Sequence, residues 1–535
     1  MEERKGTRRE FLKTTGVATL GMASGGSIKA VAVKGMPVTE VPANFNVREF
    51  GATGNGTTID SPFINQAIAA AAAVGGGTVY LPAGTYLCYS IHLRSNVDLQ
   101  FSSGTVVLAA DPAVIRGDGE GYDVPESNRP WEDYQDFGHS HWHNSLIWGE
   151  GLENISITGP GLIWGRGISR GEFQGPVAEI PGVANKAIGL KNCHGVILRD
   201  FAILHGGHFG ILTTGVDNLT IDNVKIDTNR AGIDMDCCRN VRVCNCSINA
   251  PWDDAICLKS SFALGFARAA EMITISDCMV SGSFEEGSLL DGTFKRFPPD
   301  ADIDRNGRIK LGTESNGGFK NITITNCVFD GCFGLAILSV DGAIIEDVTI
   351  SNITMRDTVA SPIFMRLGSR MRGPAGALVG AIRRINISNL VSSSESSLMC
   401  SMIVGIPDHR IENVKLSNIL LEHSGGGTKA EAARQLKEKE KEYPEPNMFG
   451  NTPAHGLLIR HAEGVEVSNY KVIAANDARP CFLLVDVERA EFSNIKTDRT
   501  ADTPVFILDT VKDFNLEQCT SLADIQIAEA DHKKL

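Results

Sequence analysis

A short alternation of apolar and polar positions recurs along most of the chain. The motif apolar–x–apolar–x–Asn/Asp occurs nine times between Val196 and Asn469. Its first three copies begin at Val196, Leu219 and Val241, which are 23 and 22 residues apart. Alternation with a period of two is typical of a strand, and a repeat in the low twenties without an intervening helical pattern indicates one coil of short strands and turns. Longer intervals between later copies indicate inserted loops.

A single coil of this kind cannot bury its apolar side chains by itself. Coils stacked about 4.8 Å apart pair every strand with its neighbours and create a continuous core. The recurring Asn or Asp then falls at one corner of each coil, where its side chain can bond the turn and the equivalent residue of the next coil. The sequence therefore predicts an all-β solenoid, a parallel β-helix. A propeller would need four strands in each blade of roughly 40 residues, and a leucine-rich repeat would need Leu in place of the Val and Ile found here.

The ends of a solenoid must be covered, because an exposed terminal coil is an adhesive edge. The Ala-rich segment from Pro62 to Val74 has apolar residues at helical spacing, and we expect it to form an N-terminal helical cap. We assign the β-helix to residues 45–520 and a C-terminal tail to residues 521–535. The Lys- and Glu-rich residues 424–453 interrupt the repeats. We interpret them as an inserted, solvated helical loop, with a place beside the substrate cleft as the alternative.

The N-terminal residues differ from the rest of the chain. Residues 8–13 read Arg-Arg-Glu-Phe-Leu-Lys and precede a weakly apolar stretch, residues 14–27, and then Ala-Val-Ala at 30–32. This order resembles a twin-arginine export signal. We predict a signal peptide at 1–32, a linker at 33–44, and export of a bacterial protein to the periplasm or the medium by the twin-arginine machinery. No later apolar run approaches the roughly 20 residues of a membrane span, so we expect no membrane contact in the mature form.

Composition narrows the class of partner. The 535 residues include 50 Lys and Arg against 64 Asp and Glu, a formal net charge of -14, which argues against nucleic acid as a partner. The thirteen cysteines include Cys246, Cys278 and Cys327, each directly after an Asn or Asp of the repeat. We expect buried thiols in a stacked interior column. No Cys and His grouping has zinc spacing, so we expect no metal and no cofactor.

Candidate chemistry lies where ionisable residues alternate with inward apolar ones. Aligning three strand cores places Ile233, Ile256 and Ile309 in one inward column. Alternation then points five charged side chains out onto one face. They are Asp234, Asp236, Lys259, Arg308 and Lys310.

Two adjacent carboxylates, Asp253 and Asp254, follow Trp252 at the entry to one of these strands. Asp is common in turns, which offers a purely structural explanation. Their position beside an outward carboxylate and matching cations favours a functional one. Crowded acids raise one another's pKa, so that one can remain protonated as a general acid while another serves as base. Hydrolysis of a glycosidic bond requires such a pair.

The sequence resembles the polygalacturonase family, glycoside hydrolase family 28. The resemblance extends from about residue 45 to 498 and rests on segments 45–52, 81–86 and 253–260; the last, Asp-Asp-Ala-Ile-Cys-Leu-Lys-Ser, is the most specific. It implies a right-handed parallel β-helix and an inverting mechanism without a metal, in which Asp253 is the general acid and Asp254 the base.

Departures from the family pattern imply a divergent member. Ala231 stands where the family has another carboxylate, and only Asp234 of that motif is retained. The family's Gly-His-Gly coil corresponds to residues 306–308, Asn-Gly-Arg, which contain no His, and residues 336–338, Ala-Ile-Leu, replace an Arg-Ile-Lys that holds galacturonate. A pectic linkage with a different sugar, of the rhamnogalacturonan type, therefore fits better than ordinary polygalacturonan.

Several further residues are candidates for substrate binding or for the missing carboxylate. Asp234, Asp291 or Glu314 would help to activate the water, and the sequence does not choose among them. Long insertions favour exo action. The expected substrate-binding residues are His208, Lys259, Arg308, Lys310 and Arg366.

The sequence thus predicts an exported glycoside hydrolase that acts on pectic oligosaccharides or polysaccharides. One alternative is a polysaccharide lyase on the same solenoid, which would usually need Ca²⁺ bound by a dense carboxylate cluster. Another is a carbohydrate-binding solenoid without catalytic activity.

Overall fold

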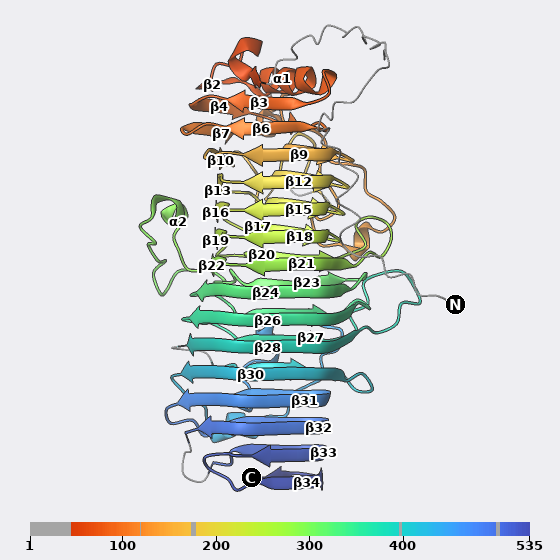
Figure 1. Ribbon diagram of the computed structural model, residues 1–535, viewed down its shortest axis with the longest axis vertical. Helices are drawn as coiled ribbons and strands as arrows, with labels where there is room; N and C mark the ends of the chain where they lie inside the picture. Colours follow the sequence, from red (N-terminus) through yellow and green to blue (C-terminus); the bar gives the residue numbers. More distant parts are fainter. Residues whose placement is uncertain (1–43, 118, 173–177, 395–397, 499–502) are drawn as a thin grey trace, which may run out of the picture. The chain divides into compact units, whose positions relative to one another are not determined.

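The computed structural model describes residues 44–117, 119–172, 178–394, 398–498 and 503–535. The predicted signal peptide, residues 1–32, lies outside these ranges, as does almost all of the predicted linker. Within them, the strands form a parallel β-helix whose coils stack in sequence order (Figure 1). No helix among the described residues has both the length and the apolar character needed to cross a membrane. The predicted all-β solenoid is confirmed.

Each coil contributes strands to up to three faces. The site face contains β5 (Ile91–His92), β8 (Ser145–Glu150), β11 (Lys186–Lys191), β14 (Phe209–Thr214), β17 (Ala231–Asp236), β20 (Ile256–Ser260), β23 (Ile309–Ser315), β25 (Leu335–Ser339), β27 (Ile363–Leu367) and β29 (Ser401–Val404). The second face contains β1 (Asn44–Asn46), β3 (Gly77–Leu81), β6 (Val97–Phe101), β9 (Glu153–Thr158), β12 (His194–Arg199), β15 (Asp217–Asp222), β18 (Arg239–Cys244) and β21 (Ala270–Ser276). The third contains β2 (Asn55–Ile59), β4 (Gly84–Cys88), β7 (Thr105–Ala109), β10 (Leu162–Trp164), β13 (Ala202–Leu204), β16 (Lys225–Asp227), β19 (Ser247–Asn249) and β22 (Met279–Ser281).

Beyond β22 the coils become simpler, because single long strands run through the corner between the second and third faces. β24 pairs with both β21 and β22. The long strands are β24 (Phe319–Asp330), β26 (Ile344–Arg356), β28 (Ala381–Ser394), β30 (Ile411–His423), β31 (Leu457–Ala474), β32 (Phe482–Thr497) and β33 (Phe506–Glu517). The helices are short apart from α1: η2 (Val47–Phe50), α1 (Ser61–Ala73), η3 (Ala113–Arg116), η4 (Glu132–Tyr134), α2 (Ser288–Asp291), α3 (Lys429–Ala432) and η5 (Pro446–Phe449).

The recurring Asn forms the predicted corner ladder. The Nδ2 atom of Asn352 donates to Oδ1 of Asn326 at 3.0 Å, and Asn389 donates to Asn352 at 3.0 Å. Asn418 and Asn469 continue the ladder, each donating to the Asn of the preceding coil at 2.9 Å. All five residues have φ between 50° and 57°, in the left-handed region that Asn tolerates better than most residues. The repeat therefore selects Asn for its backbone conformation as well as its side-chain bonds.

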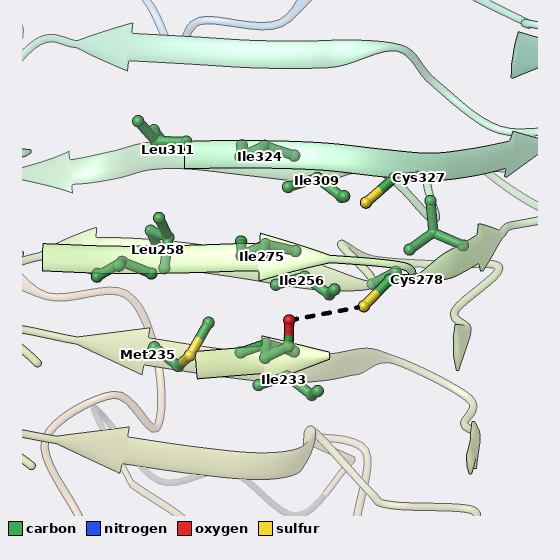
Figure 2. Packing of buried hydrophobic residues seen from close by; sticks show 14 of the residues in the cluster. Ile233, Met235, Ile256, Leu258, Ile275, Cys278, Ile309, Leu311, Ile324 and Cys327 are labelled. Atoms are coloured by element: carbon green, nitrogen blue, oxygen red, sulfur yellow. Dashed lines mark hydrogen bonds between the residues drawn. The ribbon is translucent and has the colours of Figure 1, made fainter. Parts of the chain in front are cut away.

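The interior consists of stacked apolar columns. Ile233 is in register with Ile256, and Ile256 with Ile309, so the predicted inward column is confirmed (Figure 2). Cys278 and Cys327 lie along the same interior, and all thirteen cysteines are free thiols. Apolar side chains of the same kind stack along the solenoid axis and bury one another. The core is therefore a continuous column of neighbouring coils rather than one globular centre.

Both ends of the solenoid are covered. At the N-terminal end, α1 buries Ile64 and Ile68 against the first coils, which confirms the predicted helical cap. The C-terminal residues differ from the prediction of a tail. β34 (Ile525–Ala530) pairs antiparallel with β33, and β35 (Lys533–Lys534) does so next to it. These two strands cover the edge that the last coil would otherwise expose.

The stacked core gives a direct stability prediction. Ile324→Ala removes a fully buried side chain, and we expect the free energy of unfolding to fall by about 2–5 kcal/mol, as for other large-to-small core substitutions. Ile197→Ala is the matched control, since Ile197 points outward from β12 and is 41% exposed. Urea unfolding of the two variants measures the difference. Equal midpoints would contradict the inward assignment of Ile324.

Candidate active site

A cavity of about 120 Å³ lies on the site face at β14, β17, β20 and β23. It is lined by Asp136, Phe137, His139, His208, Phe209, Arg230, Ala231, Asp234, Asp253, Asp254, Cys257, Lys259, Lys310 and Tyr443. The structure thus brings together the carboxylates Asp234, Asp253 and Asp254 and the cations Lys259 and Lys310, as the alternation along the strands predicts. Their catalytic roles remain predictions at this point.

Strand register explains why these side chains meet. Asp234 on β17 is directly beside Cys257 on β20, and Cys257 is beside Lys310 on β23. Lys259 is two residues beyond Cys257 and points to the same side. Because the inward positions of all three strands are apolar, the outward positions carry the charges.

Asp254 is buried and is held by two cations. The Nε atom of Arg308 donates to its Oδ1 at 2.8 Å, and the ammonium of Lys310 bonds its Oδ2. Burial by itself would raise the pKa of Asp254, but Lys310 and Arg308 outweigh it and hold the pKa below its usual value. Asp254 is therefore a carboxylate at neutral pH.

Asp253 is the most exposed of the three carboxylates, with 27% of its side chain accessible. Its Oδ1 accepts a hydrogen bond from the backbone N–H of Asp254 at 2.8 Å. Its Oδ2 lies 3.2 Å from Nε of Arg230, whose Nη1 is anchored on the carbonyl of Arg170 at 3.1 Å. The neighbouring aspartates consequently have different partners. Asp253 pairs with one cation, Arg230, near solvent, whereas Asp254 is buried between two cations, Arg308 and Lys310.

Asp234 shares its surroundings with Lys259. The Lys259 Nζ atom is 3.5 Å from Oδ2 of Asp234 and 2.8 Å from Oε2 of Glu314. Burial would lower the pKa of Lys259, but Asp234 and Glu314 reverse this and raise it well above its usual value. The Nε2 atom of His139 is also 3.5 Å from Oδ2 of Asp234, whereas Oδ1 of Asp234 is buried and has no hydrogen-bond partner among the described residues.

Asp136 adds a fourth carboxyl group, which the sequence analysis missed. Arg372 bridges it to Glu314, with Nη2 at 2.7 Å from Asp136 Oδ1 and 3.3 Å from Glu314 Oε1. Burial, followed by the neighbouring Glu314, raises the pKa of Asp136. Burial opposes ionisation of Glu314 as well, but Lys259 and a hydrogen bond from Asp136 hold its pKa well below the usual value. Glu314 is fully buried and does not line the cavity, so this predicted water-activating candidate lies behind the lining residue Lys259.

His208 forms an aromatic wall of the cavity. Its ring stacks on Phe209 with centroids 4.2 Å apart and on Phe137 at 5.4 Å. Burial, helped by the positive charge of Arg230, lowers the pKa of His208 well below its usual value, so the imidazole is neutral. His208 thus lies where a substrate-binding residue is expected, with an apolar rather than an ionic contact to offer.

Three candidates lie away from the cavity lining. Arg308 is fully buried between Asp254 and the inserted loop, and Arg366 is 1% exposed, donating to the carbonyls of Gly405 at 2.8 Å and Glu438 at 2.6 Å. Both guanidinium groups are bonded within the protein and neither lines the cavity, so substrate binding by Arg308 and Arg366 stays a prediction. Asp291 is exposed on α2 and bonds Thr293, away from the other candidates.

Residues that sequence reasoning missed come from loops. Asp136 and His139 precede β8, in a segment without a repeat motif, and no signal in the sequence marks them. Tyr443 belongs to the inserted loop, residues 424–453, so the alternative that this loop borders the cleft is confirmed. Two groups of described residues have spacing suited to a metal ion, and neither includes a residue of the cavity: Glu126, His143 and Glu150, and Asp509, Asp531 and His532.

The fold and the cavity together define a β-helix with an ionisable site on one face, and sequence profiles agree with the fold. A profile described as "Right handed beta helix region" matches residues 167–297, and the solenoid is right-handed as predicted. A second profile, described as "Rhamnogalacturonase A/epimerase, pectate lyase-like", matches residues 44–144.

Solved structures with the same fold include two exopolygalacturonases. The enzyme from Thermotoga maritima matches with a TM-score of 0.58 and 17% identity, over 81% of this chain and 92% of that one. The family 28 exopolygalacturonase from Yersinia enterocolitica matches with a TM-score of 0.59 and 17% identity, over 86% of this chain and 79% of that one. At this identity the similarity establishes the shared fold.

Curated relatives include mannuronan C5-epimerases, an alginate lyase and a probable polygalacturonase. The mannuronan C5-epimerase AlgE1 of Azotobacter vinelandii is 45% identical over 83 residues, 16% of this chain. The matched part spans only 5% of that epimerase. A probable polygalacturonase of Vitis vinifera is 21% identical over 405 residues, 70% of this chain and 73% of the relative.

Proposed function

We propose that this protein is a glycoside hydrolase that cleaves α-glycosidic bonds in pectic polysaccharide, rhamnogalacturonan or galacturonan oligosaccharides, by an inverting mechanism. The observation that carries the proposal is the gathering of Asp234, Asp253 and Asp254 in one cavity, each with different partners. Inversion needs one carboxyl group to protonate the leaving oxygen and a carboxylate to activate water on the other side of the sugar.

The environments of the three carboxylates suggest their roles. Asp253 is the most accessible and is the proton donor to the glycosidic oxygen. Asp254 stays ionised between Arg308 and Lys310 and acts as the base toward water. Asp234 lines the same cavity and has a buried oxygen without a hydrogen-bond partner among the described residues; its role is to help order the same water, in place of the carboxylate absent at Ala231. The sequence left this choice open between Asp234, Asp291 and Glu314; the geometry favours Asp234.

The remaining lining supports an acidic sugar as substrate. Arg230, Lys259 and Lys310 line the cavity beside the carboxylates that they pair with, and a uronate carboxylate would be a further partner for them; the His208 ring provides an apolar surface. The relatives and structural neighbours named polygalacturonases support a pectic glycan. Loops before β8 and before β31 border the cavity, which favours action at a chain end. The order of the N-terminal residues supports export by the twin-arginine route to the periplasm or the medium.

Incubation with a panel of defined pectic oligosaccharides tests the proposal. We expect release of a monosaccharide or short product, and proton NMR in the first minutes should show the anomer opposite to that of the substrate. A first-formed product that retains the configuration would contradict the inverting mechanism. Binding without turnover of any pectic glycan would favour a carbohydrate-binding solenoid instead.

A second candidate is lyase or epimerase chemistry at the carbon beside a uronate carboxylate. It is favoured by the profile match named for an epimerase and by Tyr443, which lines the cavity. The hydroxyl oxygen of Tyr443 accepts a hydrogen bond from the Thr313 hydroxyl at 2.9 Å. A phenol and a nearby carboxylate are able to remove and return the proton on the carbon beside the uronate carboxylate. Hydrolysis leaves that proton in place. Unsaturated, ultraviolet-absorbing products identify a lyase, and uptake of deuterium from heavy water into uronate residues identifies an epimerase. Each assay is run with and without chelator.

A further inference from the structure

The inserted loop, residues 424–453, is tied to the site face at several points. The guanidinium of Arg366 donates to the carbonyl of Glu438 at 2.6 Å, and the backbone N–H of Ser369 donates to the carbonyl of Glu440 at 2.7 Å. Arg460 also donates to the carbonyl of Leu436 at 3.0 Å. These bonds connect the loop to strands and turns of the site face and hold it next to the cavity.

From this loop Glu445 reaches the charged network of the site. Its two carboxylate oxygens accept from both terminal nitrogens of Arg308, at 2.7 and 2.5 Å. The third nitrogen of the same guanidinium, Nε, donates to Asp254 at 2.8 Å. Arg308 is fully buried, and all three of its nitrogens are used by two carboxylates. A bidentate pair of this kind fixes the plane of a guanidinium as well as its position.

The arrangement has an electrostatic consequence for Asp254. Arg308 divides its positive charge between Glu445 and Asp254 Oδ1, while Lys310 bonds the other carboxylate oxygen of Asp254, Oδ2. Loss of the Glu445 charge would leave the whole guanidinium charge facing Asp254. Since this region is buried and screening by solvent is weak, the change would strengthen the attraction between Arg308 and the Asp254 carboxylate.

We infer that Glu445 is a positioning residue for Asp254: through Arg308 it sets the orientation of this carboxylate and limits how firmly the cations hold it. The inference rests on the proposed function, because it assigns Asp254 the role of base. It also gives the insertion a function, since a loop between β30 and β31 completes a site built on β17, β20 and β23.

Other ionisable groups also face Asp254 and its two cations, and the test must hold them constant. They are Asp234 on β17, Asp253 beside Asp254, Cys257 and Lys259 on β20, and Tyr443 on the inserted loop. None of them is changed by a substitution at Glu445.

Glu445→Gln tests the inference through the pH profile. We expect kcat to fall by about 10- to 100-fold, as for other residues that orient a catalytic group, with little change in KM. The acidic limb of kcat/KM should move to lower pH, because Asp254 then faces an undivided guanidinium charge and is harder to protonate. Glu445→Asp should recover part of the rate. Glu442→Gln is the matched control, since Glu442 lies on the same loop, is 55% exposed and forms a surface ion pair with Lys439.

A purely structural role would lower Tm without moving the acidic limb, and that result would overturn the inference. A second measurement does not depend on turnover. In Glu445→Gln/Asp254→Asn, Arg308 loses both carboxylates, so Tm should fall by more than the sum of the two single changes. Additive Tm shifts would show that Glu445 and Asp254 are not coupled through Arg308, whatever reaction the protein catalyses. Coupled Tm shifts without any pectic hydrolysis would instead reject the proposed function and leave the connection intact.

Discussion

Asp253→Asn should lower kcat on a pectic oligosaccharide by about 10²- to 10⁴-fold, the contribution that a positioned general acid usually makes. Asp254→Asn should have an effect of the same order, because it removes the base. Neither substitution changes side-chain volume appreciably, so binding of the oligosaccharide should persist and can be measured separately by calorimetry. Asp513→Asn is the control, since Asp513 is exposed on β33, well beyond the strands that line the cavity.

The two variants should differ on substrates with an activated leaving group. A nitrophenolate leaves without protonation, so Asp253→Asn should retain much more of its activity on an aryl glycoside than on the natural linkage. Asp254→Asn should be equally impaired on both, because water must still be activated. If both variants respond alike, or if Asp254→Asn is the one rescued, the assignment of acid and base is wrong. Activity near the unmodified level in either variant would remove the proposed mechanism altogether.

The part of this site that the sequence predicts is the part built on the repeat. Asp234, Lys259 and Lys310 could be placed on one face because alternation fixes their direction and the coil length fixes their register. The same reasoning yields the Asn ladder and the inward Ile columns. Both follow from local chemistry repeated in every coil, which a single sequence displays many times over.

The remaining part depends on loops, for which no such repetition exists. Asp136 and Tyr443 come from segments whose lengths and sequences occur once in the chain, so nothing in the pattern indicates where they lie. Arg308 illustrates a subtler limit. Alternation correctly directs it away from the core, but cannot reveal that Glu445 covers it from outside. An outward position in a solenoid is therefore exposed only if no insertion packs over it.

The C-terminal end shows a related limit. The alternation at Ile525 and Ile527 is a short strand signal without the Asn that marks the other coils. Without this marker the segment is easily assigned to a tail. The structure instead uses it in antiparallel pairing with β33, where its backbone satisfies the last open edge. A strand that ends a solenoid need not carry the signature of those that build it.

The buried charges of the site predict a second large effect, this time on stability. Arg308→Met should lower the free energy of unfolding by about 3–5 kcal/mol at neutral pH, because it leaves Glu445 without its partner and Asp254 with one cation instead of two. Arg356→Met is the matched control. Arg356 is 62% exposed and also pairs with a carboxylate, that of Asp330, and a surface pair of this kind contributes at most about 1 kcal/mol.

The pH dependence of this loss provides an independent check. The folded-state pKa of Asp254 is lowered, so its ion pairs stabilise the protein above the unfolded pKa of about 3.9, and this contribution is lost as pH falls through the folded value. Without Arg308 the folded pKa of Asp254 rises toward the unfolded one. The stability difference between the unmodified protein and Arg308→Met should consequently be full at pH 7 and shrink below about pH 4. Urea unfolding at both pH values measures it. A difference that is unchanged in acid would mean that Arg308 stabilises the fold by packing, for example against the Phe333 ring 5.4 Å away, and that its ion pairs contribute little.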